Sequence, residues 1–331
     1  MEHKRYLTLF QTTSAYELFT TTDKFIKPNV SYCKDDCKVH YNPYIKDYTK
    51  DYFTIENTGD DILSVVFKQL SGETGDILDS QVTISYRTIN SDWIETCEQI
   101  NIEPHESIEI KANFRPDLSK LNVCVMEGDT ICDVKGNIMS LLFGDDFIGK
   151  TDLTGYDYAL TYLFMNNQNI ISAENLVLPA SVLSTFCYAG MFNGCTNLTT
   201  APELPATELA EVCYSEMFNG CTNLTTAPEL PATTLEHACY RNMFSGCTNL
   251  TTAPELPATT LVSWCYYSMF DGCKNLNNIT VAFTKWMADD ECTDYWVRGV
   301  ATSGTFTCPA DLPTYIGNNH NIPSEWTIVR V

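Results

Sequence analysis

The feature of this sequence that most restricts its fold is a 26-residue unit, repeated between residues 157 and 283. Nearly identical copies of CYxxMFxGCTNLTTAPELPAT begin at Cys187, Cys213 and Cys239, with a degenerate copy before them and a decaying one after them. A fixed step lets every unit repeat one backbone path and bury its apolar side only against its neighbours. The repeat therefore predicts a solenoid over 157–283.

The apolar residues within one unit indicate how it folds. Leu209, Cys213 and Met217 follow a spacing of four, which is typical of one face of a helix. Thr207 is suited to cap such a helix, and Gly220 to end it. Leu224 then occupies one short strand position, and a proline-containing segment returns in an extended path. These expectations make the repeat an α/β, leucine-rich-repeat-like solenoid.

Polar and sulfur-containing residues recur in columns along the repeat. Of the fifteen cysteines, eight form two columns, which we interpret as free core thiols and not as disulfides or metal ligands: Cys187, Cys213, Cys239, Cys265 and Cys195, Cys221, Cys247, Cys273. An asparagine column is predicted to be a buried ladder: Asn197, Asn223, Asn249, Asn275. A glutamate column is predicted to be solvated, with calcium bridging as the alternative: Glu203, Glu229, Glu255.

Net charge excludes one class of partner. Lys and Arg number 20 against 42 Asp and Glu, so the formal net charge is −22 and nucleic acid would be repelled. The start of the sequence has no secretion-signal pattern and no stretch approaches 18 apolar residues, so we expect no membrane insertion. Five histidines lie far from plausible partners in sequence, and we find no catalytic constellation or cofactor motif. We therefore expect a protein that is not an enzyme.

The remainder of the chain divides by pattern. Residues 47–116 alternate apolar and polar residues in short runs, which predicts an immunoglobulin-like β-sandwich. Residues 117–156 are expected to be a connector and N-terminal cap, and 284–331 a C-terminal cap that uses its tryptophans to cover the last coil. In the N-terminal segment, 1–46, the residues Cys33, Cys37 and His40 supply only three local zinc ligands, so a hairpin with cross-strand thiols is preferred.

The repeat unit closely resembles BspA-like leucine-rich repeats, a family of surface and virion-associated solenoids of gut anaerobes and their phages. The resemblance continues in GNIMSLLFGDDFIGKTDL, SAENLVLPA, CTDYWVRGVATSGTF and NIPSEWTIV, and so covers residues 134–331. The segment PNVSYCKDDCKVHYNP is similar to the N-terminal attachment element of structural proteins in crAss-like tailed phages. Both resemblances together imply a virion protein with an anchored N-terminus and a displayed solenoid.

What the resemblance implies about function follows from that arrangement. It implies a non-enzymatic head fibre, decoration protein or tail-associated fibre, folded in the host cytoplasm and assembled with capsid, collar or tail proteins. Fibres are commonly trimeric, so a homo-oligomer is expected by analogy. The alternative is a bacterial cell-surface adhesin with the same repeats. The attachment residues are then Pro28, Asn29, Val30, Tyr32, His40, Tyr41, Asn42 and Pro43.

Positions that vary between otherwise identical copies define a candidate ligand face for host polysaccharide or glycan. Such variation is also what an unconstrained outer surface would show, so the repeat alone does not distinguish the two. The candidate residues, all expected to be exposed, are Glu211, Ser215, Glu216, Glu236, Arg241, Asn242, Ser263, Tyr267 and Ser268.

Overall fold

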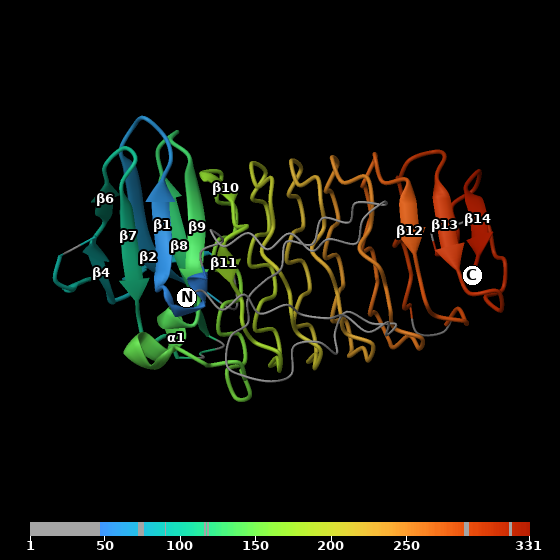
Figure 1. Ribbon diagram of the computed structural model, residues 1–331, viewed down its shortest axis with the longest axis horizontal. Coiled ribbons are helices and arrows are strands. Elements are labelled where there is room, and N and C mark those ends of the chain that lie inside the picture. Colours follow the sequence, from blue (N-terminus) through green and yellow to red (C-terminus); the bar gives the residue numbers. More distant parts are fainter. Residues whose placement is uncertain are drawn as a thin grey trace, which may run out of the picture. The chain divides into compact units, whose positions relative to one another are not determined.

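The computed structural model describes residues 47–71, 76–89, 91–115, 117, 119–287, 291–317 and 320–331. Tyr48–Val331 form one compact unit, in which two β-sheets are followed by a stack of coils that runs to the C-terminus (Figure 1). The expected attachment residues, Pro28 to Pro43, lie outside the described residues. So does the zinc-site alternative of Cys33, Cys37 and His40.

Two sheets make up the N-terminal part of this unit. The seven-stranded sheet has the order β10-β9-β1-β7-β4-β5, with β11 also on β9, and the four-stranded sheet has the order β3-β2-β6, with β8 also on β2. The strands of the first sheet are β1 (Phe53–Asn57), β4 (Ile84–Thr88), β5 (Ile94–Thr96), β7 (Ser107–Lys111), β9 (Cys132–Asn137), β10 (Ile170–Ser172) and β11 (Leu176–Val177). Those of the second sheet are β2 (Leu63–Ser71), β3 (Ile77–Gln81), β6 (Ile100–Ile102) and β8 (Lys120–Glu127).

Alternating apolar residues bring the two sheets together. In β7, Ile108 and Ile110 are buried while the residues between and beside them are partly exposed, as the two-residue period of a strand requires. Phe53 on β1 and Phe67 on β2 belong to one hydrophobic core, although their strands lie in different sheets. The apolar pattern of this region thus produces β-structure, as the sequence predicted.

Strand β9 connects the sheets to the coils. One edge of β9 pairs antiparallel with β1, and the other pairs parallel with β10 and β11, which belong to the first coil. Strand β8, next to β9 in sequence, pairs with β2 along eight residues. The ring of Phe164 in the first coil lies 5.8 Å from that of Phe53. The first coil therefore covers its apolar face with a sheet that is itself part of the N-terminal core.

The segment expected to be a helix in each repeat is instead a run of three β-turns, so that prediction was wrong. The amide of Met217 donates to the carbonyl of Tyr214 (3.3 Å), and the turns before and after it close in the same way. The third residue of each turn, Val212, Glu216 and Gly220, has a positive φ of 59°, 59° and 74°. Positive φ at this position is the requirement of a type II turn and is incompatible with a helix.

The period of the apolar residues explains the difference. The pairs Cys213-Tyr214 and Met217-Phe218 repeat every four residues without drift, whereas a helix has 3.6 residues per turn. Alternate amides close the turns, and the others bond to the next coil: Val212 to the carbonyl of His237 (2.9 Å) and Glu216 to that of Arg241 (2.8 Å). Alternate backbone donors are thereby satisfied only by stacking, which a single repeat could not achieve.

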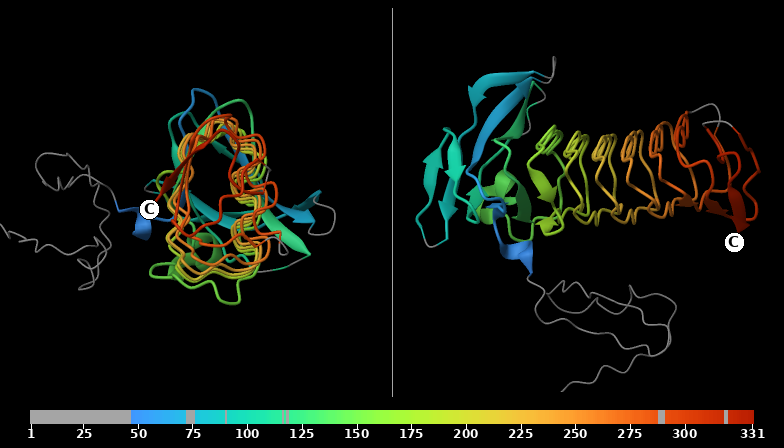
Figure 2. Two further views of the ribbon diagram at one scale, coloured as in Figure 1. Left: turned by 90° about the vertical axis from the view of Figure 1, so that its right-hand side faces the viewer. Right: turned by 90° about the horizontal axis from the view of Figure 1, so that it is seen from above.

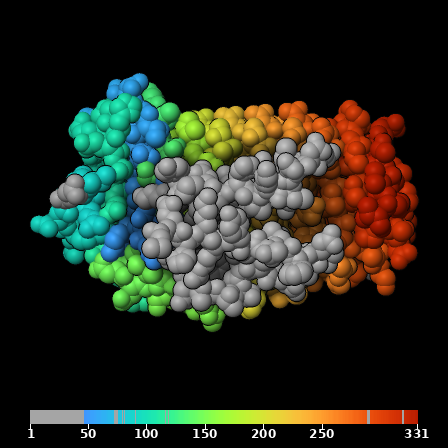
Figure 3. All heavy atoms as spheres, in the orientation of Figure 1, coloured from blue at the N-terminus to red at the C-terminus, as the bar shows by residue number. Residues whose placement is uncertain are grey.

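Viewed along the stack, successive coils follow nearly the same path (Figure 2, left), and their outer atoms form a continuous surface (Figure 3). Identical side chains therefore lie over one another. The rings of Tyr214 and Tyr240 stack with centroids 6.0 Å apart, and those of Phe218 and Phe244 at 5.7 Å. The interior of the coils is a set of such columns.

Both cysteine columns belong to this interior. All eight cysteines are free thiols and fully buried, which confirms the core-thiol interpretation. In the second column each thiol donates to a phenylalanine carbonyl of the preceding coil, as Cys221 does to Phe192 (3.1 Å). Burial raises the pKa of Cys195 to about 12. A thiol with so high a pKa stays protonated and unreactive near neutral pH.

The asparagine column lies on the outside, so the prediction of a buried ladder was wrong. Asn223, Asn249 and Asn275 are exposed, and Asn197 is partly exposed. The side-chain amide of Asn249 contacts the amide oxygen of Asn223, at 3.5 Å. The backbone groups that a buried asparagine would have satisfied are already paired by the turns, whereas Leu224 beside it is fully buried, as predicted. The glutamate column is exposed, as its expected solvation requires.

The coil pattern continues beyond Phe283. Residues 291–299 repeat the turns, with positive φ at Glu291, Tyr295 and Gly299, and Trp296 stands in the apolar column above Phe270. Strands β12 (Asn278–Thr280), β13 (Thr305–Cys308) and β14 (Thr327–Arg330) then pair in parallel. The ring nitrogens of Trp286, Trp296 and Trp326 donate to backbone carbonyls, so each tryptophan is held by a hydrogen bond as well as by packing.

Helical structure is sparse in the part of the chain that the structure describes. It holds one short α-helix, α1 (Ser140–Phe143), and two 3-10 turns, η2 (Tyr48–Lys50) and η3 (Gly144–Asp146). None of these elements has the length or apolar character to cross a bilayer. The described fold is thus mostly β, and the helical half of the predicted α/β repeat is not present.

Candidate functional site

Stacked turns give the coils one outward face with variable side chains. In each turn the first and fourth residues point into the core, as Tyr214 and Met217 do, and the second and third form the tip. We call the surface made by these tips over residues 185–272 the turn face. Because the backbone of the turns is fixed by bonds along the stack, the turn face holds its side chains in regular rows.

One row of the turn face contains a hollow. Successive coils place Phe186, Val212, Ala238 and Trp264 at the same turn position, so two small side chains lie between two aromatic ones. The resulting hollow has a volume of about 410 Å³, within the range of about 300–1,000 Å³ usual for small-ligand pockets. It is lined by Tyr162, Phe186, Ala189, Val212, Ser215, Glu216, His237, Ala238, Arg241 and Trp264.

Arg241 supplies the positive charge of the hollow. Its guanidinium carbon lies 5.2 Å from the centre of the Trp264 ring and 5.7 Å from that of Tyr267, and these two rings stack on each other 4.8 Å apart. The Nε atom of Arg241 is buried and has no hydrogen-bond partner among the described residues. No carboxylate of the described chain lies within 4.0 Å of this guanidinium. Arg241 is therefore held by stacking, with hydrogen-bonding capacity to spare.

Glu216 provides hydrogen-bond acceptors in the lining of the hollow. Its carboxylate lies 3.4 Å from the Tyr162 hydroxyl, 3.3 Å from the Asn193 amide nitrogen and 3.5 Å from that of Asn242. Burial, with a contribution from Glu216, raises the pKa of Tyr162 to about 12. The Tyr162 hydroxyl therefore stays protonated and donates to the carboxylate. These long contacts leave Glu216 able to accept further hydrogen bonds.

The structure brings together part of the predicted ligand face. Ser215, Glu216 and Arg241 line the hollow, Asn242 contacts Glu216, and Tyr267 stacks on Trp264. The remaining predicted residues, Glu211, Glu236, Ser263 and Ser268, are not part of the lining.

Two serines of the predicted face do not have the expected exposure. Ser215 is only 3% exposed and Ser268 only 6%, because neighbouring coils cover the tips on which they lie. The Ser215 hydroxyl donates to the carbonyl of Arg241 in the next coil (3.2 Å), so it supports the wall of the hollow. Their expected exposure was therefore wrong, and a contact role for Ser268 is not supported.

Seven lining residues were missed from the sequence: Tyr162, Phe186, Ala189, Val212, His237, Ala238 and Trp264. Phe186 and Trp264 directly precede the first cysteine of their copies, where the other two copies have Val212 and Ala238. This change of side-chain size was a usable signal. It was overlooked because the position directly precedes the buried cysteine, so the predicted helix placed it beside its core-facing stripe and not on the ligand face.

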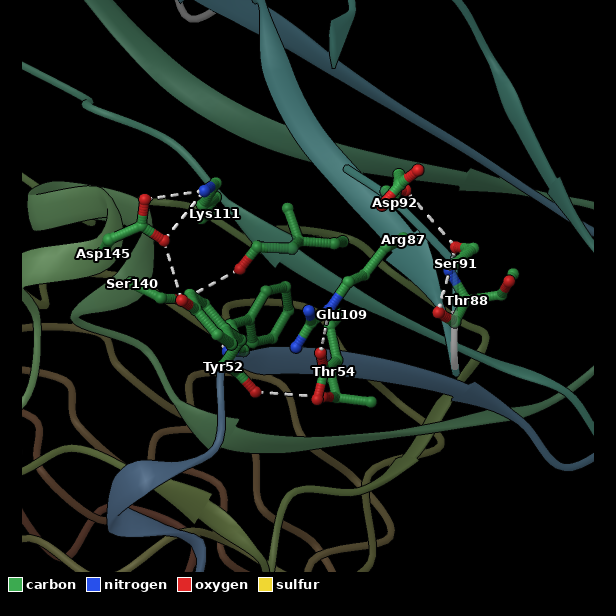
Figure 4. Close-up of polar contacts among 12 residues, drawn as sticks. Tyr52, Thr54, Arg87, Thr88, Ser91, Asp92, Glu109, Lys111, Ser140 and Asp145 are labelled. Carbon is green, nitrogen blue, oxygen red and sulfur yellow. Dashed lines mark hydrogen bonds and ion pairs between the residues drawn. The ribbon is translucent and has the colours of Figure 1, made fainter. Parts of the chain in front are cut away.

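A second polar cluster lies on the outer surface of the seven-stranded sheet (Figure 4). Arg87 and Lys111 both stack on the Trp93 ring, at 4.6 and 4.3 Å, and Lys111 also bonds Asp145 at 2.8 Å. The Tyr52 hydroxyl donates to the same carboxylate (2.7 Å). Burial, then the bond to Asp145, raises the pKa of Tyr52 to about 12.

Each charge in that second cluster has a partner of opposite sign, since Arg87 bonds Glu109 at 2.6 Å and Lys111 bonds Asp145. The cluster joins β4, β7 and the residues after α1, so it is suited to fixing the edge of the sheet. It offers a ligand less unused hydrogen-bonding capacity than the hollow at Arg241 does.

Among the described residues, no group of three or more His, Cys, Asp or Glu side chains is placed to hold a metal ion. Comparison with known protein families, curated proteins and solved structures finds no match. The hollow at Arg241 is accordingly the candidate site that the geometry favours.

Proposed function

We propose that this chain is a non-enzymatic structural protein of a phage virion, anchored by its N-terminal segment, which displays the stacked coils to bind saccharides of a host surface. In this proposal the two sheets are an immunoglobulin-like spacer and the coils are a BspA-like solenoid. The resemblance of the repeat and of the N-terminal segment supports the virion assignment. Adhesion is supported by the turn face itself.

The observation that carries the adhesive role is the hollow between Phe186 and Trp264. Aromatic faces suit the apolar C–H faces of a sugar ring, and the groups around them, Glu216 and Arg241, supply an acceptor and donors for hydroxyl groups. Backbone bonds between coils hold these groups in place before a ligand arrives. Such preorganisation lowers the entropy cost of binding.

A glycan-binding assay on the full chain tests the proposal. The intact protein should bind a subset of an immobilised panel of bacterial surface polysaccharides and intestinal glycans. Trp264→Ala and Phe186→Ala should each weaken that binding about tenfold or more, because each removes one aromatic wall. Tyr315→Ala is the matched control, since Tyr315 is 56% exposed and lies outside the hollow.

Two results would count against the adhesive role. One is the absence of binding to any member of the panel by the folded wild-type chain. The other is equal loss in Tyr315→Ala and Trp264→Ala, which would place binding elsewhere. The virion assignment is tested separately, by antibody labelling of purified phage particles whose genome encodes the chain. Particles without label would overturn it.

A further inference from the structure

The charges of the hollow specify the ligand more closely. Resting on the proposed saccharide-binding function, we infer that the hollow selects a sugar that carries a carboxylate, such as a uronic or sialic acid, and that Arg241 binds this carboxylate. The inference starts from an imbalance. Arg241 is a cation with no carboxylate within 4.0 Å among the described residues, in a chain whose acidic residues exceed its basic ones.

The buried Nε atom is the strongest part of this argument. An N–H group shielded from water and without a partner is unfavourable, and buried donors in proteins nearly always have an acceptor. The carbonyl of Arg241 itself is already engaged, since it accepts from the Glu216 amide and the Ser215 hydroxyl. A ligand acceptor that displaces the side chains covering the Nε atom would restore the missing bond.

The stacking of Arg241 favours a planar, bidentate acceptor. The guanidinium carbon lies 5.2 and 5.7 Å from the ring centres of Trp264 and Tyr267. A cation–π contact of this kind uses none of the N–H groups as hydrogen-bond donors. Guanidinium edges match the two oxygens of a carboxylate in a fork of parallel hydrogen bonds. A neutral sugar hydroxyl would use only part of this capacity.

Glu216, which also lines the hollow, limits how many charges the ligand carries. It makes loose contacts of 3.3–3.5 Å to Asn193, Tyr162 and Asn242, and its carboxylate repels an anion but accepts hydroxyl groups. The formal net charge of −22 opposes a polyanion at longer range. The fitting ligand thus has one carboxylate toward Arg241, a ring between Phe186 and Trp264, and hydroxyls toward Glu216.

Paired probes that differ in one acidic sugar test the inference on the full chain. Titrations with 3′-sialyllactose against lactose, and with methyl glucuronide against methyl glucoside, should show about tenfold or greater preference for the acidic member of at least one pair. Arg241→Gln should remove that preference, so that the acidic member of the pair binds no more tightly than the neutral member. Arg241→Lys should retain part of it, since lysine keeps the charge but loses the fork.

Arg298→Gln is the matched control. Arg298 also stacks on a tyrosine, with its guanidinium carbon 5.0 Å from the centre of the Tyr295 ring, but its Nε already donates to Asp271 (2.9 Å). Loss of the Arg298 guanidinium should therefore not alter the preference for the acidic sugar. Quenching of Trp264 fluorescence by the acidic probe, absent in Trp264→Phe, locates the event in the hollow, and thermal melting confirms that each variant is folded.

The outcomes separate the two proposals. Equal binding of acidic and neutral probes, or a preference that survives Arg241→Gln, would overturn the inference while leaving saccharide binding intact. Failure of all four probes together with failure of the whole glycan panel would overturn the proposed adhesive function itself. Failure of the acidic probes when neutral members of the panel bind would overturn only the inference.

Discussion

At the scale of single residues, several polar side chains inside the coils have no hydrogen-bond partner. The main-chain groups around them already bond to one another. Free thiols form two columns, and the hydroxyls of Tyr188, Tyr214 and Tyr240 are buried without a hydrogen-bond partner in the described chain. Packing therefore holds most of the interior of the coils. Side-chain hydrogen bonds add to it where thiols donate to phenylalanine carbonyls of the preceding coil and where the buried Trp296 donates to a main-chain carbonyl.

We predict that the column thiols resist alkylation in the folded protein. Burial raises the pKa of Cys187, Cys195 and Cys273 to about 12, so at pH 8 the reactive thiolate is on the order of one part in ten thousand. Iodoacetamide followed by peptide mass spectrometry should label the partly exposed Cys97 and spare these three. Resistance should persist up to pH 10, still below the raised pKa, and vanish in denaturant.

Labelling of Cys195 at the rate of Cys97 in the native protein would contradict this burial. The control is the same reaction in denaturant, where all described cysteines should react alike. Labelling of all described cysteines in denaturant would also exclude disulfides within the columns in solution. An oxidised cysteine stays unlabelled even after unfolding unless it is first reduced.

At the scale of elements, the sequence predicted the repeat better than its local structure. The step of 26 residues, the buried thiols and the inward Leu224 were predictable because stacked units must place identical residues over one another. The turns were not. A spacing of four was interpreted as a helix, and the sign that contradicts this, positive φ at Val212 and Glu216, is invisible when the residues are not glycine.

The candidate site was partly predictable for the same reason. Variation between copies drew attention to Arg241 and Glu216, which do line the hollow. Trp264 and Phe186 directly precede buried cysteines, so the predicted helix placed their position beside its core-facing stripe and not on the ligand face. The hollow itself depends on the small Ala238 lying between larger side chains of other coils. Which residues of different coils are neighbours can be told only when the register of stacking is known.

Substitution at Gly220 tests the turn conformation directly. With φ at 74°, a side chain there is strained, although a Cβ atom would meet only the Gly194 Cα at 3.6 Å, an ordinary contact. Gly220→Ala should therefore lower the free energy of unfolding by about 1 kcal/mol. Gly220→Asn should cost less, since asparagine tolerates positive φ and Asn166 occupies the equivalent position at 58°.

Denaturant unfolding of the two variants beside wild type gives the comparison. A stabilising effect of Gly220→Ala would argue for a helix across this segment, because alanine is the better helix former. Equal costs for alanine and asparagine would show that crowding, and not backbone conformation, sets the penalty.

At the scale of the whole molecule, the coils depend on one another and on the sheets. The first coil pairs with β9, and the hydrophobic core runs without a break from Phe53 to Trp326. A coil taken alone would leave the alternate amides of its turns unpaired. The number of coils is nevertheless adjustable, because each interface repeats the same contacts.

Deleting one full repeat should leave a folded protein. Removal of residues 213–238 joins Val212 to Cys239 in register and should shorten the stack by one coil, roughly 4.8 Å, with little change in melting temperature. It also removes Ser215, Glu216, His237 and Ala238, so glycan binding should be lost. Small-angle scattering, thermal melting and the glycan assay provide the three measurements.

Removal of half a repeat, residues 213–225, is the matched control. It displaces every later column by 13 residues and should abolish cooperative melting. A full-repeat deletion that unfolds as readily as the half-repeat deletion would show that the coils are not equivalent units.

The alternation of amides described for the turns has a mechanical consequence. Bonds such as those from Glu216 to Arg241 and from Gly220 to Ser245 run from one coil to the next, whereas the bonds that close each turn lie within a coil. Tension applied between Tyr48 and Val331 would load the inter-coil bonds in series, so coils should detach singly. In the proposed adhesive role, such a stack would lengthen stepwise under shear while the coils that are still stacked stay bound to the host surface.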